Sequence, residues 1–259
     1  MGLFDFLKPE TTPVPSPPKS KQGVSPYLGD LAKTGALYEL ISVPKSDRDE
    51  DWNTAFLANL PAASFRCGNP QIIQGPDGFP NFQLFLPEPN VGYQCYVIDK
   101  MKDDFLLDRG LGVVINPTST GPDWVLSYGD VLNYHLNHEF YATGETPFSK
   151  QLSDEVLQSK QEVMIGQPSE LLLPRLTRNV LREYFISNGI ASPKAMLMMR
   201  RLANGAGISQ DLAFNITPQN FDNEETYRSV MQRLAWFLPR HYSFVGMREE
   251  SVGNGFMPL

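Results

Sequence analysis

The last hundred residues constrain the fold most, because their apolar pattern switches between the two-residue repeat of strands and the 3.6-residue repeat of helices. Between residues 160 and 248 the pattern predicts the order strand, helix, strand, strand, helix, strand. The strands are expected at Glu162–Ile165, 194–202, Asp211–Thr217 and Tyr242–Met247. A compact α+β domain over residues 151–259 follows from this order.

Both helices of this region have start or stop signals. Pro174 suits the first position of a helix, where its missing N–H costs nothing, and Asn188-Gly189 supplies a C-terminal cap. Asp222 and Glu225 are spaced as a capping box at the start of the second helix. Together, strands and helices match a ferredoxin-like βαββαβ unit.

A first domain is expected over residues 27–150. Helical spacing predicts helices at 27–42 and 48–60, and a third from Gly129 to Tyr141. Turn residues separate the extended segments between them, which are Ala63–Cys67, Gln71–Gln74, Phe82–Leu86, Tyr93–Ile98, Gly112–Asn116 and Trp124–Ser127. We therefore expect a mixed or antiparallel sheet covered by helices, and an α+β protein of two domains.

A leader over residues 1–26 precedes these domains. Six of the 22 prolines lie between residues 9 and 26, without apolar periodicity, so a disordered, proline-rich linker is expected there. Four apolar residues stand ahead of it: Leu3, Phe4, Phe6 and Leu7. This cluster is predicted either to stay free or dock on its own domain, or to engage a partner as a short motif.

Charge and composition narrow the function classes. The net charge is −7, and residues 27–150 alone carry eight basic and sixteen acidic side chains. Because no segment has the basic stripe that phosphate backbones require, nucleic acid is not an expected partner. No apolar run approaches the roughly 20 residues of a membrane helix. Two cysteines, Cys67 and Cys95, and no signal-peptide pattern favour a cytoplasmic protein.

Several short segments resemble a known family. In the C-terminal half these are Ile165-Gly-Gln-Pro168, Leu173-Pro174, Ile190-Ala191 and Asp211–Ile216 with the closing helix and strand. Gly112-Val-Val-Ile-Asn-Pro117 adds a segment in the N-terminal half, whereas residues 41–90 lie outside the resemblance. These segments resemble the bacterial enhanced serine sensitivity family, the SseB-like proteins. The resemblance implies a bacterial, cytoplasmic protein and assigns it no chemistry.

Three histidines are the main candidates for chemistry. His135 and His138 lie three residues apart on one expected helix, beside Glu139, whereas zinc-protease helices need two histidines four residues apart. Half-buried structural histidines are the first interpretation, and neither a metal site nor a cofactor is expected. A hydrolase site formed by Asp130, His135 and His138 is the alternative.

Two acidic, aromatic segments are the candidate binding residues. Aromatic anchors flanked by charge are typical of protein interfaces. The candidates are Asp77, Phe79, Asp123, Trp124, Tyr128 and Asp130. For Trp124, Tyr128 and Asp130 a structural role, in the core or as a helix cap, is the competing interpretation. The sequence thus favours a non-enzymatic protein-interaction or regulatory module whose partner it does not identify.

Overall fold

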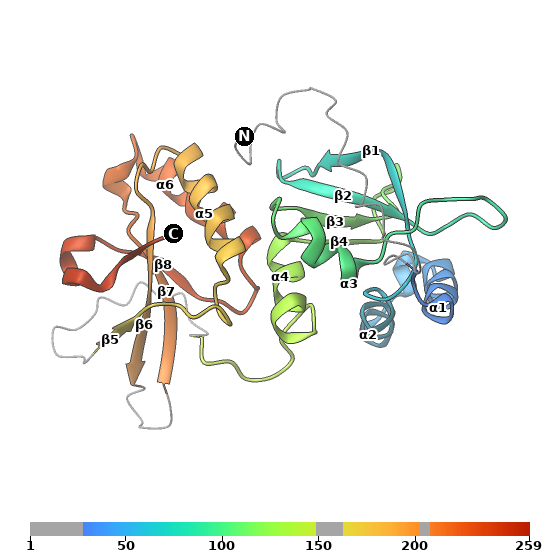
Figure 1. Cartoon of the computed structure of the whole chain (residues 1–259), viewed down its shortest axis with the longest axis horizontal. Coiled ribbons are helices and arrows are strands. Elements are labelled where there is room, and N and C mark those ends of the chain that lie inside the picture. Colours follow the sequence, from blue (N-terminus) through green and yellow to red (C-terminus); the bar gives the residue numbers. More distant parts are fainter. Residues whose placement is uncertain (1–27, 149–162, 202–207) are drawn as a thin grey trace, which may run out of the picture. The chain divides into compact units, whose positions relative to one another are not determined.

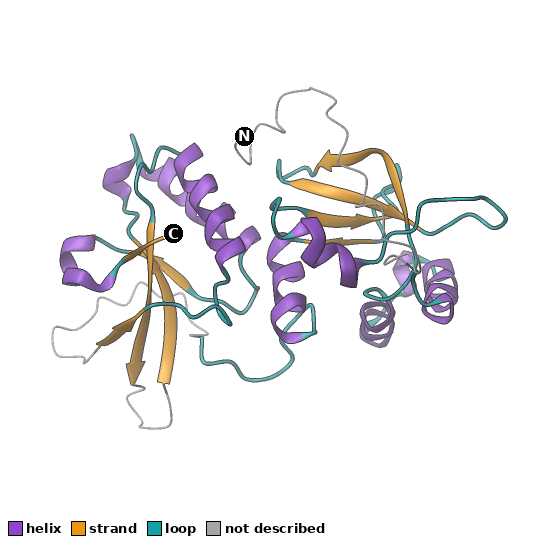
Figure 2. Cartoon of the chain, viewed as in Figure 1, coloured by secondary structure: helices purple, strands orange, loops and turns teal. Residues whose placement is uncertain are grey.

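The computed structural model describes residues 28–148, 163–201 and 208–259. The predicted leader, with its apolar cluster, lies outside the described residues, and so does the predicted domain boundary at residue 150. The chain divides into two compact units, whose described residues run from 28 to 131 and from 132 to 259. Both units combine helices with a mixed sheet, as the α+β prediction requires (Figure 2).

The first unit contains a four-stranded sheet, ordered β1-β2-β3-β4. These strands are β1 (Arg66–Gln74), β2 (Pro80–Phe85), β3 (Gly112–Ile115) and β4 (Trp124–Leu126). Two pairs are antiparallel, and β2 pairs with β3 in parallel. The parallel pair needs a crossover, which contains α3 (Ile98–Met101) and a π-helical turn at Lys102–Leu106 (Figure 1).

Two helices, α1 (Leu31–Ser42) and α2 (Glu50–Asn59), precede this sheet. Asp30 caps α1, because its carboxylate accepts hydrogen bonds from the amides of Ala32 and Lys33, so the helix begins later than predicted. Asp49 caps α2 in the same way, at 2.8 Å from the amide of Trp52. Each helix therefore starts where a side chain satisfies its first free N–H groups.

Three predicted strands of this unit are wrong in detail. Gln71–Gln74 and the last two residues of Ala63–Cys67 belong to one strand, β1, whose register shifts between Cys67 and Ile72, while Ala63 and Phe65 form only isolated bridges. Within Tyr93–Ile98 only Tyr96 forms a bridge, with Phe65, and Ile98 already begins α3. Periodicity alone does not distinguish a short buried strand from a short buried loop, which is why Tyr93–Ile98 was predicted to be a strand.

The second unit has a sheet ordered β5-β6-β7-β8, with β9 beside β6. Its strands are β5 (Val163–Gly166), β6 (Lys194–Arg201), β7 (Ile208–Phe214), β8 (Phe244–Gly246) and β9 (Met257–Pro258). Its helices α5 (Arg175–Ser187) and α6 (Glu224–Leu234) follow the predicted order. The helix α4 (Tyr128–Asn137) runs across the division between the units.

The finer prediction of a ferredoxin-like unit is not confirmed. A split β-α-β motif would place another strand between the two strands that a helix joins. Here β7 and β8, joined by α6, are direct parallel neighbours, and β5 and β6, joined by α5, are direct antiparallel neighbours. The element order was therefore predictable, whereas the hydrogen-bonding order was not.

In the second unit, α5 contacts both the sheet and α6. The ring of Phe185 on α5 lies 5.3 Å from that of Phe214 on β7, so α5 packs on the sheet. Tyr184 joins α5 to α6, since its hydroxyl donates to the carbonyl of Val230 at 2.8 Å.

No helix among the described residues is long and apolar enough to cross a bilayer.

Candidate functional site

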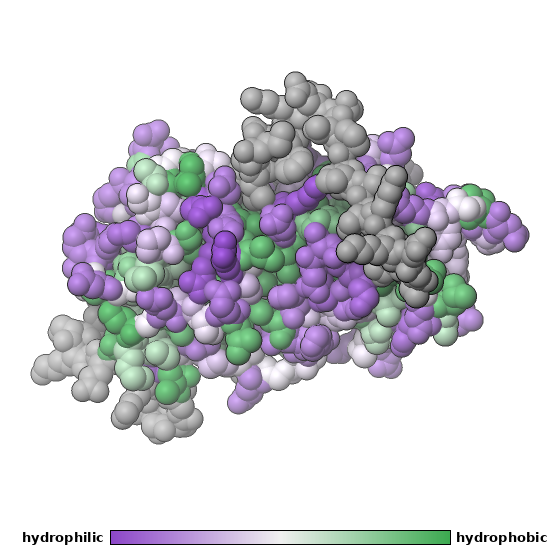
Figure 3. All heavy atoms as spheres, viewed as in Figure 1, coloured by the Kyte–Doolittle hydropathy of each residue, from purple (hydrophilic) through white to green (hydrophobic). Residues whose placement is uncertain are grey.

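An apolar groove of about 270 Å³ lies between α1 and the loop that follows β2. We call it the α1 groove. Its walls come from two segments of the first unit, which together contribute Leu31, Thr34, Gly35, Tyr38, Pro87, Glu88, Pro89 and Tyr93. Figure 3 shows apolar atoms at the surface near α1, and Figure 1 shows the loop extending away from the sheet.

One wall of the groove is a stripe along α1. Leu31, Thr34, Gly35 and Tyr38 recur at the spacing that places side chains on one helix face. Leu31 is 77% exposed and Tyr38 is 41% exposed, while Leu37 on the same helix is fully buried. The helix thus packs with one face and leaves an apolar stripe on another.

Gly35 makes the middle of this wall open. A Cβ atom added to Gly35 would meet no heavy atom within 4 Å. This glycine lies inside a helix, where glycine costs about 1 kcal/mol relative to alanine. Neither packing nor backbone conformation requires a glycine at position 35. The absence of a side chain leaves open space in this wall of the groove.

The opposite wall is the loop between β2 and α3. Pro89 and Tyr93 are exposed there, and Pro87 is buried. Glu88 forms an ion pair of 2.8 Å with Arg66 on β1. The guanidinium of Arg66 also lies 4.9 Å from the ring centre of Phe85. The ion pair between Arg66 and Glu88 joins the loop to β1 next to the groove.

Two tyrosines give the groove its polar character. Burial raises the pKa of Tyr38 above its ordinary value, the neighbouring Tyr93 and Glu88 raise it further, and Arg66 opposes them. The hydroxyl of Tyr38 therefore stays protonated at neutral pH, and a tyrosine hydroxyl can donate a hydrogen bond. The groove presents aromatic faces and two O–H donors to whatever lies in it.

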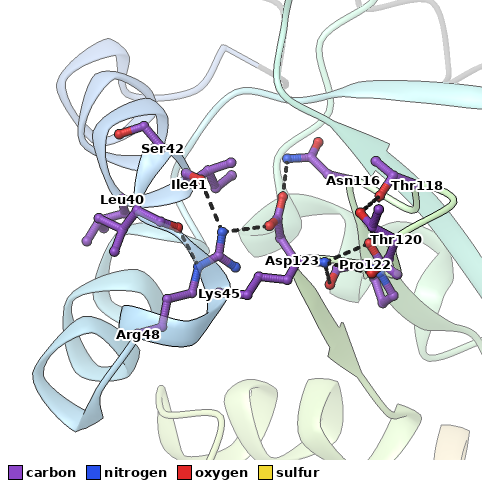
Figure 4. A network of polar contacts seen from close by, with 12 residues as sticks. Leu40, Ile41, Ser42, Lys45, Arg48, Asn116, Thr118, Thr120, Pro122 and Asp123 are labelled. Carbon is purple, nitrogen blue, oxygen red and sulfur yellow. Dashed lines mark hydrogen bonds and ion pairs between the residues drawn. The ribbon is translucent and has the colours of Figure 1, made fainter.

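The predicted binding residue Asp123 lies elsewhere, in the polar network of Figure 4. Its carboxylate is 2.9 Å from the guanidinium of Arg48 and accepts a hydrogen bond of 2.9 Å from Asn116. Arg48 also donates to the carbonyls of Ile41 and Val43. With side-chain exposures of 10% for Arg48 and 11% for Asp123, the pair joins α1 and α2 to the sheet.

The other candidates near Asp123 have structural partners. Trp124 packs against Phe56 and Trp52, with ring centres 5.6 and 6.0 Å apart. Tyr128 is fully buried, and its hydroxyl donates to the carbonyl of Leu107. Asp130 is also fully buried; it accepts from the amide of Ser127, whose hydroxyl accepts from the amide of Asp130. This reciprocal pair is a capping box at the start of α4.

Asp77 and Phe79 lie in the turn between β1 and β2. Asp77 is exposed and its carboxylate accepts from the amide of Phe79, while the Phe79 ring is 4% exposed. Gly78 adopts a φ of 81°, which favours glycine. Only Asp77 of these two side chains is available to a partner.

Asp130, His135 and His138 are spread along α4 and the residues that follow it. His135 lies on α4 five residues after Asp130, which is about 140° around the helix axis. His138 is exposed beyond the end of α4, with a φ of 60° and its ring against Tyr134. Within the described ranges, no three His, Cys, Asp or Glu side chains are grouped to hold a metal ion. Cys67 and Cys95 are both free.

Sequence reasoning missed the α1 groove. The available signal was the spacing of Leu31, Gly35 and Tyr38 on one face of the expected helix, with a glycine where a core helix would place a larger residue. The second wall had no such signal, because a loop containing Pro87 and Pro89 has no periodicity.

Comparisons of the chain with models of protein families, with curated proteins and with solved structures find no match.

Proposed function

We propose that the chain is a non-enzymatic protein-interaction module, and that the α1 groove binds an extended segment of a protein. The exposed stripe of Leu31 and Tyr38 carries this proposal, because apolar side chains that face a groove with aromatic and proline walls gain by being covered. Drug-sized ligands occupy pockets of roughly 300–1,000 Å³ that enclose them. At about 270 Å³, the groove suits a few side chains of a peptide better.

Panning a peptide display library against the full chain tests this proposal. Gly35→Gln is the informative variant, because a Cβ atom at residue 35 meets no heavy atom within 4 Å and a longer side chain is expected to extend into the groove. Selected peptides should bind the wild-type chain and lose at least about 10-fold in affinity with Gly35→Gln, the loss expected for a hot-spot contact. Gly35→Ala is the matched control and should bind nearly as well as wild type. A selection in which no peptide depends on residue 35 would contradict the proposal.

We also propose that the two units are separate α+β domains, the second built on the βαββαβ element order. The division of the chain into two compact units supports this. Calorimetry of the full chain should then resolve two unfolding transitions, whereas one cooperative transition would argue for a single folding unit.

Family and location are proposals of the same kind. The short segments around Ile165, Leu173 and Val114 support membership of the enhanced serine sensitivity family, and with it a bacterial, cytoplasmic origin. In this proposal the apolar cluster of Leu3, Phe4, Phe6 and Leu7 is a further predicted contact with a partner.

A further inference from the structure

We propose that the segment bound in the α1 groove is the proline-rich part of the chain's own leader, residues 13–18. The inference rests on the proposed function, since it names the occupant of the same groove. An outside segment would then compete with the leader for the same groove.

The chemistry of the groove fits a proline-rich segment. Such segments favour the polyproline II conformation, which is preformed and has no internal hydrogen bonds. They are recognised in shallow grooves lined by aromatic rings. In the α1 groove the rings of Tyr38 and Tyr93 supply these faces, and their hydroxyls can donate to the unpaired carbonyls of the segment. Leu31, Pro87 and Pro89 add apolar surface to the same walls.

The leader carries a suitable segment. Residues 13–18 read Pro-Val-Pro-Ser-Pro-Pro, so four of six positions fix φ near the polyproline value. Lys19 and Lys21 follow directly. Glu88 lines the groove as half of an ion pair with Arg66, and residues 27–150 as a whole carry twice as many acidic as basic side chains. The net charges of the leader segment and of residues 27–150 are therefore opposite, which favours their encounter.

Chain length brings the segment within reach. The described chain begins at Leu28, three residues before Leu31 in the groove wall, and Pro18 lies ten residues before Leu28. Ten residues span at most about 36 Å. A tether of this length gives an effective concentration of order millimolar. Even weak intrinsic binding would therefore keep the groove occupied by the leader.

The apolar cluster at residues 3–7 is the competing occupant. It presents four large side chains within five residues, more than an open groove of about 270 Å³ accommodates together. Its tether is also about twice as long, which lowers the effective concentration. The groove therefore favours the prolines.

The experiment measures the affinity of a labelled peptide of residues 11–20 for two forms of the full chain. One is the wild type, and the other carries Pro15→Ala, Pro17→Ala and Pro18→Ala in the leader. With a millimolar effective concentration and an intrinsic Kd near 0.1 mM, displacement of the leader should weaken binding to the wild type about 10-fold. Gly35→Gln in the triple variant should abolish binding, and Leu3→Ser with Phe4→Ser should leave the wild-type affinity unchanged.

Equal affinity for wild type and triple variant, or no binding to the triple variant, would overturn the inference. An affinity gain on changing Leu3 and Phe4 would also overturn it, since it would identify the cluster as the occupant. A dependence on protein concentration would do the same, because it would place the leader of a second copy in the groove. In each case library peptides that depend on Gly35 would still support the proposed function, so the two failures are distinguishable.

Discussion

At the scale of single residues, the pair Arg48–Asp123 shows how a charged side chain that looks available can be committed to the fold. Both side chains are nearly buried, and Arg48 additionally lies 4.4 Å from the ring centre of Trp52. Asp123 follows Pro122 in an acidic, aromatic segment, which is why the sequence pointed to an interface. Its partner Arg48 lies 75 residues earlier in the chain, so the local sequence around Asp123 could not predict the pair.

Asp123→Ala should destabilise the first unit by about 3 kcal/mol, because it leaves the Arg48 guanidinium largely buried without its carboxylate. Urea unfolding measures the change. Arg228→Ala is the control: its ion pair with Glu224 is exposed on both sides, so a change within about 0.5 kcal/mol is expected. A similarly small effect for Asp123→Ala would show that the network does not hold the helices to the sheet.

Gly35→Ala should raise the free energy of unfolding by up to about 1 kcal/mol, since the new methyl group meets nothing and helix propensity improves. Gly189→Ala should do the opposite, because Gly189 has a φ of 90° after α5. Thermal unfolding of both variants provides the measurement. A destabilising Gly35→Ala would show that the fold does not tolerate a Cβ atom at residue 35.

His241 makes the stability of the second unit depend on pH. Burial lowers the pKa of His241 below its ordinary value, with Glu139 opposing, and the rings of Phe148 and Tyr242 lie edge-on to the imidazole. The unfolded chain therefore takes up the proton first as the pH falls. Stability should be full above about pH 6.5 and decrease below it. His241→Gln should reduce this decrease in unfolding experiments between pH 7.5 and 5.5; an unchanged slope would exclude His241 as its source.

At the scale of elements, the sequence predicted the position of helix α6 but not the residue that caps it. Asp222 and Glu225 were the predicted capping box of α6, but the cap is Asn223, whose amide oxygen accepts from the backbone and hydroxyl of Thr226. Adjacent Asp and Asn are equally good caps, so composition alone does not choose between them. The helix itself followed from its apolar stripe.

Asn223→Ala should therefore cost about 1 kcal/mol, the usual loss for a helix cap, while Asp222→Ala should be nearly neutral. Chemical unfolding of the two variants side by side tests the assignment. A larger loss of stability for Asp222→Ala than for Asn223→Ala would show that Asp222 is the cap.

In the sheets, the positions of several strands were predictable from the sequence, whereas their order was not. The sequence pattern located β2, β3, β6 and β7 as short segments between turn residues, although β2 and β3 are buried at most positions and do not alternate. It did not find the order of β5 to β8 in the sheet, since hydrogen-bond partners are set by tertiary packing and not by local pattern. The crossover helix α3 begins at Ile98, the last residue of a segment predicted to be extended, and no helix was predicted there.

At the scale of the whole molecule, the predicted α+β class holds for both units, and the candidate site lies where no motif pointed. Of the six predicted binding residues, Phe79, Tyr128 and Asp130 are buried, Asp123 and Trp124 are half-buried, and Asp77 is exposed. The groove instead combines one helix face with a loop some fifty residues later, and such a surface arises only when the chain folds.

The most direct measurement of the central claim maps where a selected peptide binds on the full chain by amide chemical shifts. The account predicts that the perturbed amides concentrate at residues 31–38 and 87–93, on the two walls of the α1 groove. Perturbations concentrated elsewhere, for example at the exposed Met164 and Ile165 of β5, would contradict it.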